Sequence, residues 1–214
     1  MPTLYNLEIP SLLSSVKVIK IADNAFNGCT KLGTVTVVGG YEEGQEVALT
    51  DIGASAFEGC TNLERVQLYE AQQLKSIGAR AFAGCTQLTL VQCYNNRVEP
   101  GTSQYAVCLS NTMTVGNEAF KNCSSLSKGV MLSDSPAEGQ TEILGVDVFA
   151  GTKITAVMVW NGNGCSIPAN AFTGVTTITE VSLNGVSNIG ESAFKGCTGL
   201  STVELYEVES IGAY

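Results

Sequence analysis

The chain has 214 residues, of which 44% are hydrophobic and 14% charged, and its 20 acidic and 11 basic side chains give a net charge of −9. This composition suits a folded protein with a sizeable core, and its acidic balance disfavours nucleic acid and anionic membrane surfaces as partners. No stretch approaches the roughly eighteen consecutive apolar residues of a membrane span.

The chain begins with a partial copy of a pattern that then returns along its whole length. Residues 4–9 match the end of I-x-x-x-A-F-x-G-C-[ST]-x-L-x-x-V-x-L, and residues 211–214 begin a further copy. Between them lie seven full or edited copies, at residues 21–37, 52–68, 77–93, 115–132, 144–159, 167–183 and 189–205. Self-similarity at this spacing is typical of a solenoid, whose stacked units share one core. We therefore expect a single domain over residues 1–214.

Each copy predicts the same local structures in the same order. The V-x-L segment alternates inward and outward residues and predicts a short strand, so stacked copies predict a parallel sheet. An extended segment ending at the motif Ile follows, as in residues 74–77 and 186–189. Ala and Phe suit one helical turn, which the next Gly, or Asn122 in one copy, ends with a positive φ. Each Phe is expected to stack on that of the preceding coil: Phe26, Phe57, Phe82, Phe120, Phe149, Phe172 and Phe194.

The cysteines follow the repeat. Five of the eight share one motif position that is expected to point inward: Cys29, Cys60, Cys85, Cys123 and Cys197. Val175 takes this position in the sixth copy, so a small apolar side chain suffices there and we expect reduced, buried thiols. Cys93 occupies the last apolar position of a strand and is interpreted in the same way. Cys108 and Cys165 fall in predicted loops and are the pair to consider if a disulfide exists.

Extra residues collect after the strands, mainly at residues 38–51, 94–114 and 133–143 and more modestly at 160–166. Insertions at one repeat position emerge along one edge of a solenoid. From strand end to motif Ile the seven copies carry two bases, Lys75 and Arg97, and eleven acids: Glu42, Glu43, Glu46, Asp51, Glu70, Glu99, Asp134, Glu138, Glu142, Glu207 and Glu209. We interpret this acidic edge as a solvated one that keeps the protein soluble, rather than as a cation site.

On these residues the chain resembles the BspA-like leucine-rich repeats, whose unit has the same A-F-x-G-C-x-x-L-x-x-V-x-L core. The resemblance implies a right-handed leucine-rich-repeat solenoid of the α/β class, with short parallel strands on the concave side and extended segments and single helical turns on the convex side. It also implies adhesion or protein binding at microbial surfaces, possible host or matrix protein partners, and an extracellular or cell-surface location. The start of the chain, residues 1–3, has no signal-peptide features, which fits a cytoplasmic protein unless a signal was trimmed.

The inventory of reactive side chains disfavours an enzyme. With no histidine in the sequence, Ser-His-Asp and Cys-His arrangements and the commonest transition-metal ligand are missing. No C-x-x-C occurs, and the G-x-G at residues 162–164 lacks the third glycine of a dinucleotide site. We predict no catalytic residues, no cofactor and no metal site.

The outward residues of the strands form the candidate ligand-binding surface. We assign binding to nine residues on the predicted concave face: Gln67, Tyr69, Gln92, Tyr94, Met131, Met158, Trp160, Glu204 and Tyr206. Tyr, Trp and Met are enriched where proteins bind other proteins. A row of this length suits a protein segment or an extended glycan. The alternative is that the long insertions fold back over these rings, or that neighbouring rings cover one another.

The sequence thus predicts a non-enzymatic protein-binding or adhesion module that uses the concave sheet and the inserted edge loops. The alternative is a structural protein that self-associates end to end, because neither terminal partial copy carries a polar cap. Neither interpretation requires nucleic acid or a membrane span.

Overall fold

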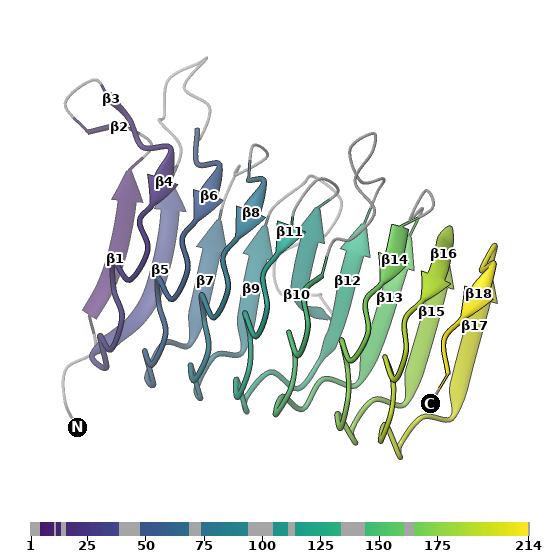
Figure 1. Cartoon of the computed structure of the whole chain (residues 1–214). Helices are drawn as coiled ribbons and strands as arrows, with labels where there is room; N and C mark the ends of the chain where they lie inside the picture. Colours follow the sequence, from purple (N-terminus) through teal and green to yellow (C-terminus); the bar gives the residue numbers. More distant parts are fainter. Residues whose placement is uncertain are drawn as a thin grey trace.

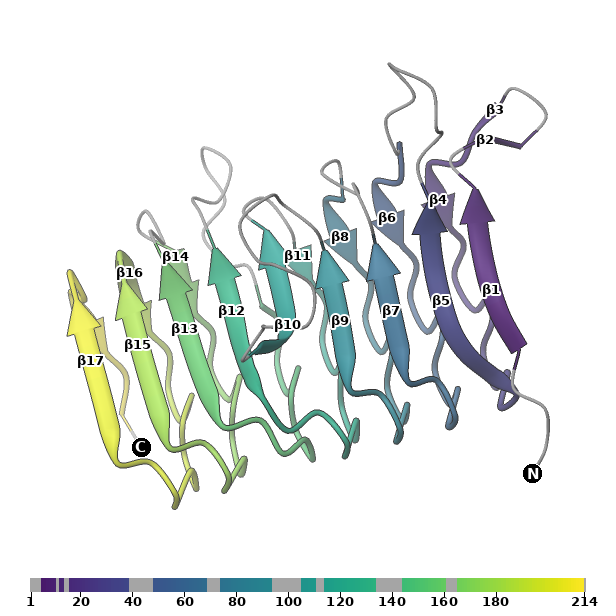
Figure 2. The same ribbon diagram turned by 180° about the vertical axis from the view of Figure 1, so that it is seen from behind.

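The computed structural model describes residues 5–10, 12–13, 16–38, 48–68, 74–93, 105–110, 114–133, 144–160 and 165–213. This part of the chain contains eighteen strands and no helix. In Figure 1 the chain rises along one large sheet, crosses over, descends through short strands on the other side and turns back into the next coil. Successive coils advance in a right-handed sense from the N-terminus to the C-terminus (Figures 1 and 2). The predicted right-handed solenoid is confirmed.

The large sheet is parallel and forms one wall of every coil. Its nine strands lie in the order β1 (Tyr5–Pro10), β5 (Leu32–Val38), β7 (Arg65–Leu68), β9 (Leu90–Cys93), β10 (Tyr105–Ser110), β12 (Gly129–Ser133), β13 (Ala156–Trp160), β15 (Glu180–Asn184) and β17 (Thr202–Tyr206). The alternation of the V-x-L segment explains which side chains of each strand are buried. In β5, for example, Val35 and Val37 are buried while Thr36 between them is half-buried on the other face.

Short strands that end at or near the motif Ile form the opposite wall. A four-stranded sheet contains β4 (Lys20–Ile21), β6 (Asp51–Ile52), β8 (Ser76–Ile77) and β11 (Thr114–Val115), and a three-stranded sheet contains β14 (Cys165–Ile167), β16 (Val186–Ile189) and β18 (Ser210–Ile211). Leu144 joins this wall through a bridge to Val115. An antiparallel pair, β2 (Leu12–Leu13) and β3 (Val16–Lys17), lies near the N-terminal coil.

The phenylalanines form a continuous ladder between the two walls. All seven rings stack in sequence order, with centroids 5.1 to 5.6 Å apart and planes within 8° of parallel. This spacing lies within the range of favourable aromatic stacking. The five inner rings are fully buried, whereas Phe26 and Phe194 at the two ends are only partly buried. The predicted stacking of Phe on Phe is therefore confirmed.

The segment around each Phe is a pair of tight turns, so the predicted helical turn is wrong. Arg80, two residues before Phe82, has a φ of +58°, and the corresponding residue of every other copy has a φ of +53° to +60°. A right-handed helix cannot contain that conformation. Instead, the Phe82 amide donates to Ala119 O of the next coil at 2.8 Å, and the Gly84 amide donates to Lys121 O, also at 2.8 Å. Hydrogen bonding between coils thus replaces hydrogen bonding within a helix.

Two positions of the repeat are occupied by glycine for different reasons. The glycine after Phe has a φ of +70° to +75° in six copies, and Asn122 takes the same region at +61°, as predicted. The glycine after the motif Ile was not predicted to matter. A Cβ on Gly78 would lie 2.5 Å from Ala54 N of the preceding coil, so the close approach of the backbones excludes a side chain.

The motif cysteines hydrogen-bond from coil to coil. The Sγ of Cys60, Cys85 and Cys123 donates to the Phe carbonyl of the preceding coil at 3.1 Å, and that of Cys197 does so at 3.2 Å. These four thiols are buried and free, as predicted. Cys29 is also free but exposed, which corrects its assignment to the core. It lies in the first turn, where no preceding Phe turn covers it.

The insertion at residues 94–114 contains a strand that was not predicted. Strand β10 pairs with β9 on one side and β12 on the other, inside the large sheet. The turns step directly from Phe82 to Phe120 across a ring spacing of 5.4 Å, and β8 pairs directly with β11. Strand β10 is therefore an additional strand of the large sheet, with no short strand and no Phe turn of its own in the described part of the chain.

The different burial of the motif cysteines predicts the order in which an alkylating reagent modifies them. Burial raises the pKa of Cys60 to about 11 and that of Cys123 to about 12, so the reactive thiolate is scarce near pH 8. We expect iodoacetamide to alkylate exposed Cys29 in the native protein within minutes, and Cys60, Cys85 and Cys123 only after unfolding. Peptide mass spectrometry, with a sample in concentrated guanidinium chloride as the control, measures both. Equal labelling of Cys29 and Cys123 in the native protein would contradict the burial of Cys123.

Candidate functional site

The middle residues of the large strands form one row across the face of the sheet that points away from the core, which we call the open face. Strand register places side by side the residues Glu8, Thr36, Gln67, Gln92, Cys108, Met131, Met158, Ser182 and Glu204. Five of the nine residues assigned to ligand binding belong to this row. Glu204 is exposed, whereas Gln67, Met131 and Met158 are half-buried. The description of Gln92 covers its backbone only.

Two aromatic side chains that lie two residues beyond the middle row are exposed on the open face. Trp160 is 64% exposed and Tyr206 is 52% exposed. Asn184 lies opposite Tyr206. Val159 lies opposite Leu183, which places the next residue, Trp160, beside Asn184. Trp160, Asn184 and Tyr206 therefore form one row. With strands about 4.8 Å apart, Trp160 and Tyr206 are roughly 10 Å from each other. Tyr69 and Tyr94, which are assigned to the same row, lie outside the described residues.

Tyr105 at the start of β10 covers the centre of the open face. Its hydroxyl donates to Met158 Sδ at 3.1 Å. Its ring passes over Gly129, where an added Cβ would lie 2.8 Å from Tyr105 Cδ1 and 3.4 Å from Ala156 Cβ. An inserted segment therefore lies over the open face at Gly129 and Met158, whereas the rings of Trp160 and Tyr206 remain exposed. Outward residues stay exposed on both sides of Tyr105, such as Glu8 and Arg65 toward the N-terminus and Glu180 and Glu204 toward the C-terminus.

Sequence reasoning missed Tyr105 because it treated the insertion as a loop. The signal was present in Val107 and Leu109, a V-x-L pair whose side chains are buried like those of the other strands. The same error affects the cysteines. Cys108 lies in β10 and Cys165 in β14, in two different sheets; both are buried in strands rather than in loops, and they are not joined by a disulfide.

Ion pairs occur on the turn side of the coils, away from the open face. Arg80 bridges Glu58 and Glu118, and Lys121 lies 2.6 Å from Glu118. The hydrogen bond from Arg80 holds the pKa of Glu58 below its usual range, and Lys121 lowers that of Glu118. The Arg80 contacts pair charges of neighbouring coils, the Lys121–Glu118 contact lies within one coil, and none of them involves a residue of the open face.

Little of the predicted acidic edge lies within the described residues. Its acids at positions 42, 43, 46, 70, 99, 134, 138 and 142, and the base at 97, fall outside them. Asp51 accepts hydrogen bonds from Ser76 Oγ at 2.5 Å and Thr50 Oγ1 at 2.6 Å, which lower its pKa. Glu207 and Glu209 are exposed beside β17 and β18. The part of the chain that the structure describes holds no group of three or more potential metal ligands.

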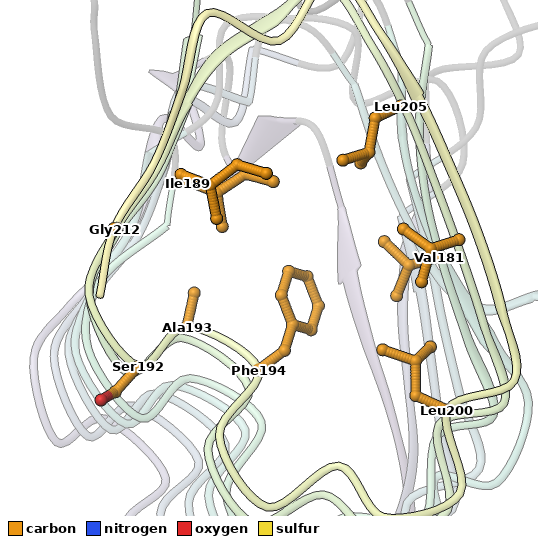
Figure 3. Close-up of a pocket in the computed structure, with 11 residues that line it drawn as sticks. Val181, Ile189, Ser192, Ala193, Phe194, Leu200, Leu205 and Gly212 are labelled. Carbon is orange, nitrogen blue, oxygen red and sulfur yellow. The ribbon is translucent and has the colours of Figure 1, made fainter. Parts of the chain in front are cut away.

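Both ends of the solenoid expose part of the core. An apolar pocket of about 450 Å³ lies at the N-terminal coil, lined by Tyr5, Leu7 and Phe26 among others. A pocket of about 130 Å³ lies at the C-terminal coil, where Figure 3 shows Phe194, Leu200 and Leu205 directed into the interior of the coil.

Together, the parallel sheet, the opposite wall of short strands and the Phe turns define a leucine-rich-repeat solenoid. The family model for the BspA type leucine rich repeat region matches residues 3–112 and 102–214, with six copies. The chain therefore belongs to the BspA-type leucine-rich repeat family. Such proteins generally act as protein-interaction modules. No curated protein matches the chain.

Solved structures of similar shape come from bacteria. A leucine-rich repeat protein of T. pallidum is 24% identical with a TM-score of 0.66, over 93% of this chain and 79% of its own. A leucine-rich cell surface protein of Faecalibacterium prausnitzii is 26% identical with a TM-score of 0.65, over 95% of this chain and 48% of its own. The chain thus spans about half the length of the second protein. The described residues contain no helix with the length and hydropathy of a membrane span.

The contact between Tyr105 and Gly129 can be tested by a double-mutant cycle. Gly129→Ala forces the Tyr105 ring aside, and we expect it to lower the free energy of unfolding by about 1 to 2 kcal/mol. In a Tyr105→Ala background the same change should cost less, because the ring is gone. Urea denaturation of the four proteins measures the coupling. If the two changes were simply additive, Tyr105 would not lie over Gly129.

Proposed function

We propose that this chain is a non-enzymatic protein-binding module that acts through the open face of its large sheet, with Trp160 and Tyr206 as anchors. The observation that carries the proposal is the exposure of these two rings next to inward residues that pack in the core: Val159, beside Trp160, is buried, and Leu205, beside Tyr206, is partly buried. The strands are thus held by the core while their outward rings are available to a partner. Exposed aromatic side chains of this kind supply much of the energy of protein interfaces.

The other assigned residues have a supporting role in this proposal. Glu204, Met158 and Gln67 border the two anchors or continue the middle row, and they supply polar and adaptable contacts. The inserted edge loops are proposed as further contacts beside the sheet. Adhesion to a host or matrix protein at a cell surface is the biological form of the proposal, supported by the family and by the similarity to the leucine-rich cell surface protein of F. prausnitzii.

Removal of both rings tests the proposed anchors. The wild-type chain and the Trp160→Ala/Tyr206→Ala variant are immobilised, and the proteins that each of them retains are compared. Each retained protein is then purified, and its Kd for both chains is measured by biolayer interferometry. We expect the double variant to weaken the Kd by about thirtyfold or more, since one hot-spot side chain contributes about 2 kcal/mol.

A matched control separates this effect from a general loss of exposed apolar surface. Val16 and Val146 are exposed but lie outside the large sheet, so Val16→Ala/Val146→Ala should bind as the wild type does. Circular dichroism confirms that both double variants remain folded. Unchanged affinity of Trp160→Ala/Tyr206→Ala for every retained partner would refute the proposed surface.

End-to-end self-association is a second candidate, favoured by the apolar residues that the two end coils expose. Ile211 is 58% exposed at one end and Tyr5 is 59% exposed at the other. If a second copy continued the strand register, its Ile21 would follow Ile211, because the motif Ile residues pair with one another along the short sheets. A stack of copies would then extend both walls of the solenoid.

Light scattering across a concentration series tests this candidate on the 214-residue chain. We expect the average mass to rise with concentration for the wild type and to stay at that of the monomer for Ile211→Asp, because a charge at the contact opposes burial. Val146→Asp, an exposed substitution away from both ends, should behave as the wild type does. A wild-type chain that stays monomeric throughout the series would exclude stacking.

A further inference from the structure

The C-terminal part of the chain holds most of the net negative charge. Residues 129–214 contain nine acidic and two basic side chains, whereas residues 1–128 contain eleven acidic and nine basic ones. The C-terminal part therefore carries −7 of the net charge of −9. Its two basic residues, Lys153 and Lys195, lie in the segments between the two walls rather than on the strands of the large sheet.

The part of the open face that carries Trp160 and Tyr206 lies within this acidic region. Strands β13, β15 and β17 contain no lysine or arginine, and Glu180 and Glu204 are exposed on them. Register places Glu180 opposite Thr202, so the two carboxylates sit on neighbouring strands, two residues apart along the sheet. Glu204 accepts a hydrogen bond from Ser182 Oγ at 3.4 Å. Neither carboxylate has an ion pair within the described residues.

These carboxylates lie on the same face as the proposed anchors, with Glu204 two residues before Tyr206 and Glu180 four residues before Asn184. Trp160 and Tyr206 lie on the two strands that flank β15, with Asn184 between them. The face thus combines two aromatic rings with negative charge and an amide. Aromatic faces attract guanidinium and ammonium groups, and carboxylates form charge-assisted hydrogen bonds with the same groups.

We propose that the partner of this face is a positively charged protein segment, with arginine or lysine side chains packed against Trp160 and Tyr206 and paired with Glu180 and Glu204. This inference rests on the proposed function and names the chemistry of its partner. The surplus negative charge would also speed the encounter with such a segment at low salt. A sulfated or otherwise anionic polysaccharide would be repelled by the same field.

The test uses a fluorescein-labelled peptide of alternating arginine and threonine, which presents its arginines along one side when extended. Fluorescence anisotropy measures its binding at low and at physiological salt. We expect the wild type to bind it, and Glu180→Gln/Glu204→Gln to weaken binding about tenfold. Trp160→Ala/Tyr206→Ala should weaken it as well.

The matched control removes the same charge from another surface. Glu191 lies in a Phe turn and Glu209 precedes β18, and both are exposed in the same part of the chain. Glu191→Gln/Glu209→Gln should retain the wild-type affinity. Equal weakening by both pairs would reduce the effect to bulk charge and overturn the inference.

The outcomes also separate this inference from the function on which it rests. If the wild type ignores the arginine peptide but loses a protein partner through Trp160→Ala/Tyr206→Ala, the face binds protein of another chemistry and only the inference fails. If a neutral oligosaccharide binds and is lost in that variant while the peptide does not bind, both the cationic segment and the protein partner are refuted in favour of a glycan.

Discussion

Stacking of one coil on the next at a single strand spacing is the constraint on which the whole molecule depends. The Phe rings repeat every 5.1 to 5.6 Å, and the turn amides donate to the carbonyls of the neighbouring coil. No coil could bury its own apolar side alone, so stability is shared between neighbours. The same spacing explains why Gly78 has no room for a side chain and why the Cys123 thiol reaches the Phe82 carbonyl.

One strand departs from this repeat and divides the open face. Strand β10 widens the large sheet where the turns and the short strands continue without a counterpart. Tyr105 then crosses Gly129 to reach Met158, so the centre of the face is occupied by the chain itself. The part of the face formed by β13, β15 and β17, where Trp160 and Tyr206 lie, is on the C-terminal side of this contact. A single insertion in a regular solenoid thus covers the outward positions at Gly129 and Met158.

Rigid strands and an adaptable surface chemistry are separate properties of this fold. The inward residues of β13 and β15 are buried almost completely, which holds the backbone in place whatever the outward residues are. The outward positions can therefore vary between proteins of one family without loss of the core. In this chain they combine aromatic rings with carboxylates, and the charge asymmetry along the sequence coincides with that area. Protein interaction as the general property of the family is consistent with such a division.

The sequence by itself determined the solenoid, because a repeat of inward Val, Leu, Ile and Phe can bury its apolar side only by stacking. It also determined the alternation of the strands and the positive φ of the glycine after Phe. It could not show that the Phe segment is not helical, since Ala and Phe suit a helix and only the hydrogen bonds to the next coil decide otherwise. Likewise, the exposure of Cys29, the pairing of β10 and the position of the Tyr105 ring depend on which coil lies beside each residue. Those neighbours are distant in sequence, and only the tertiary structure brings them together.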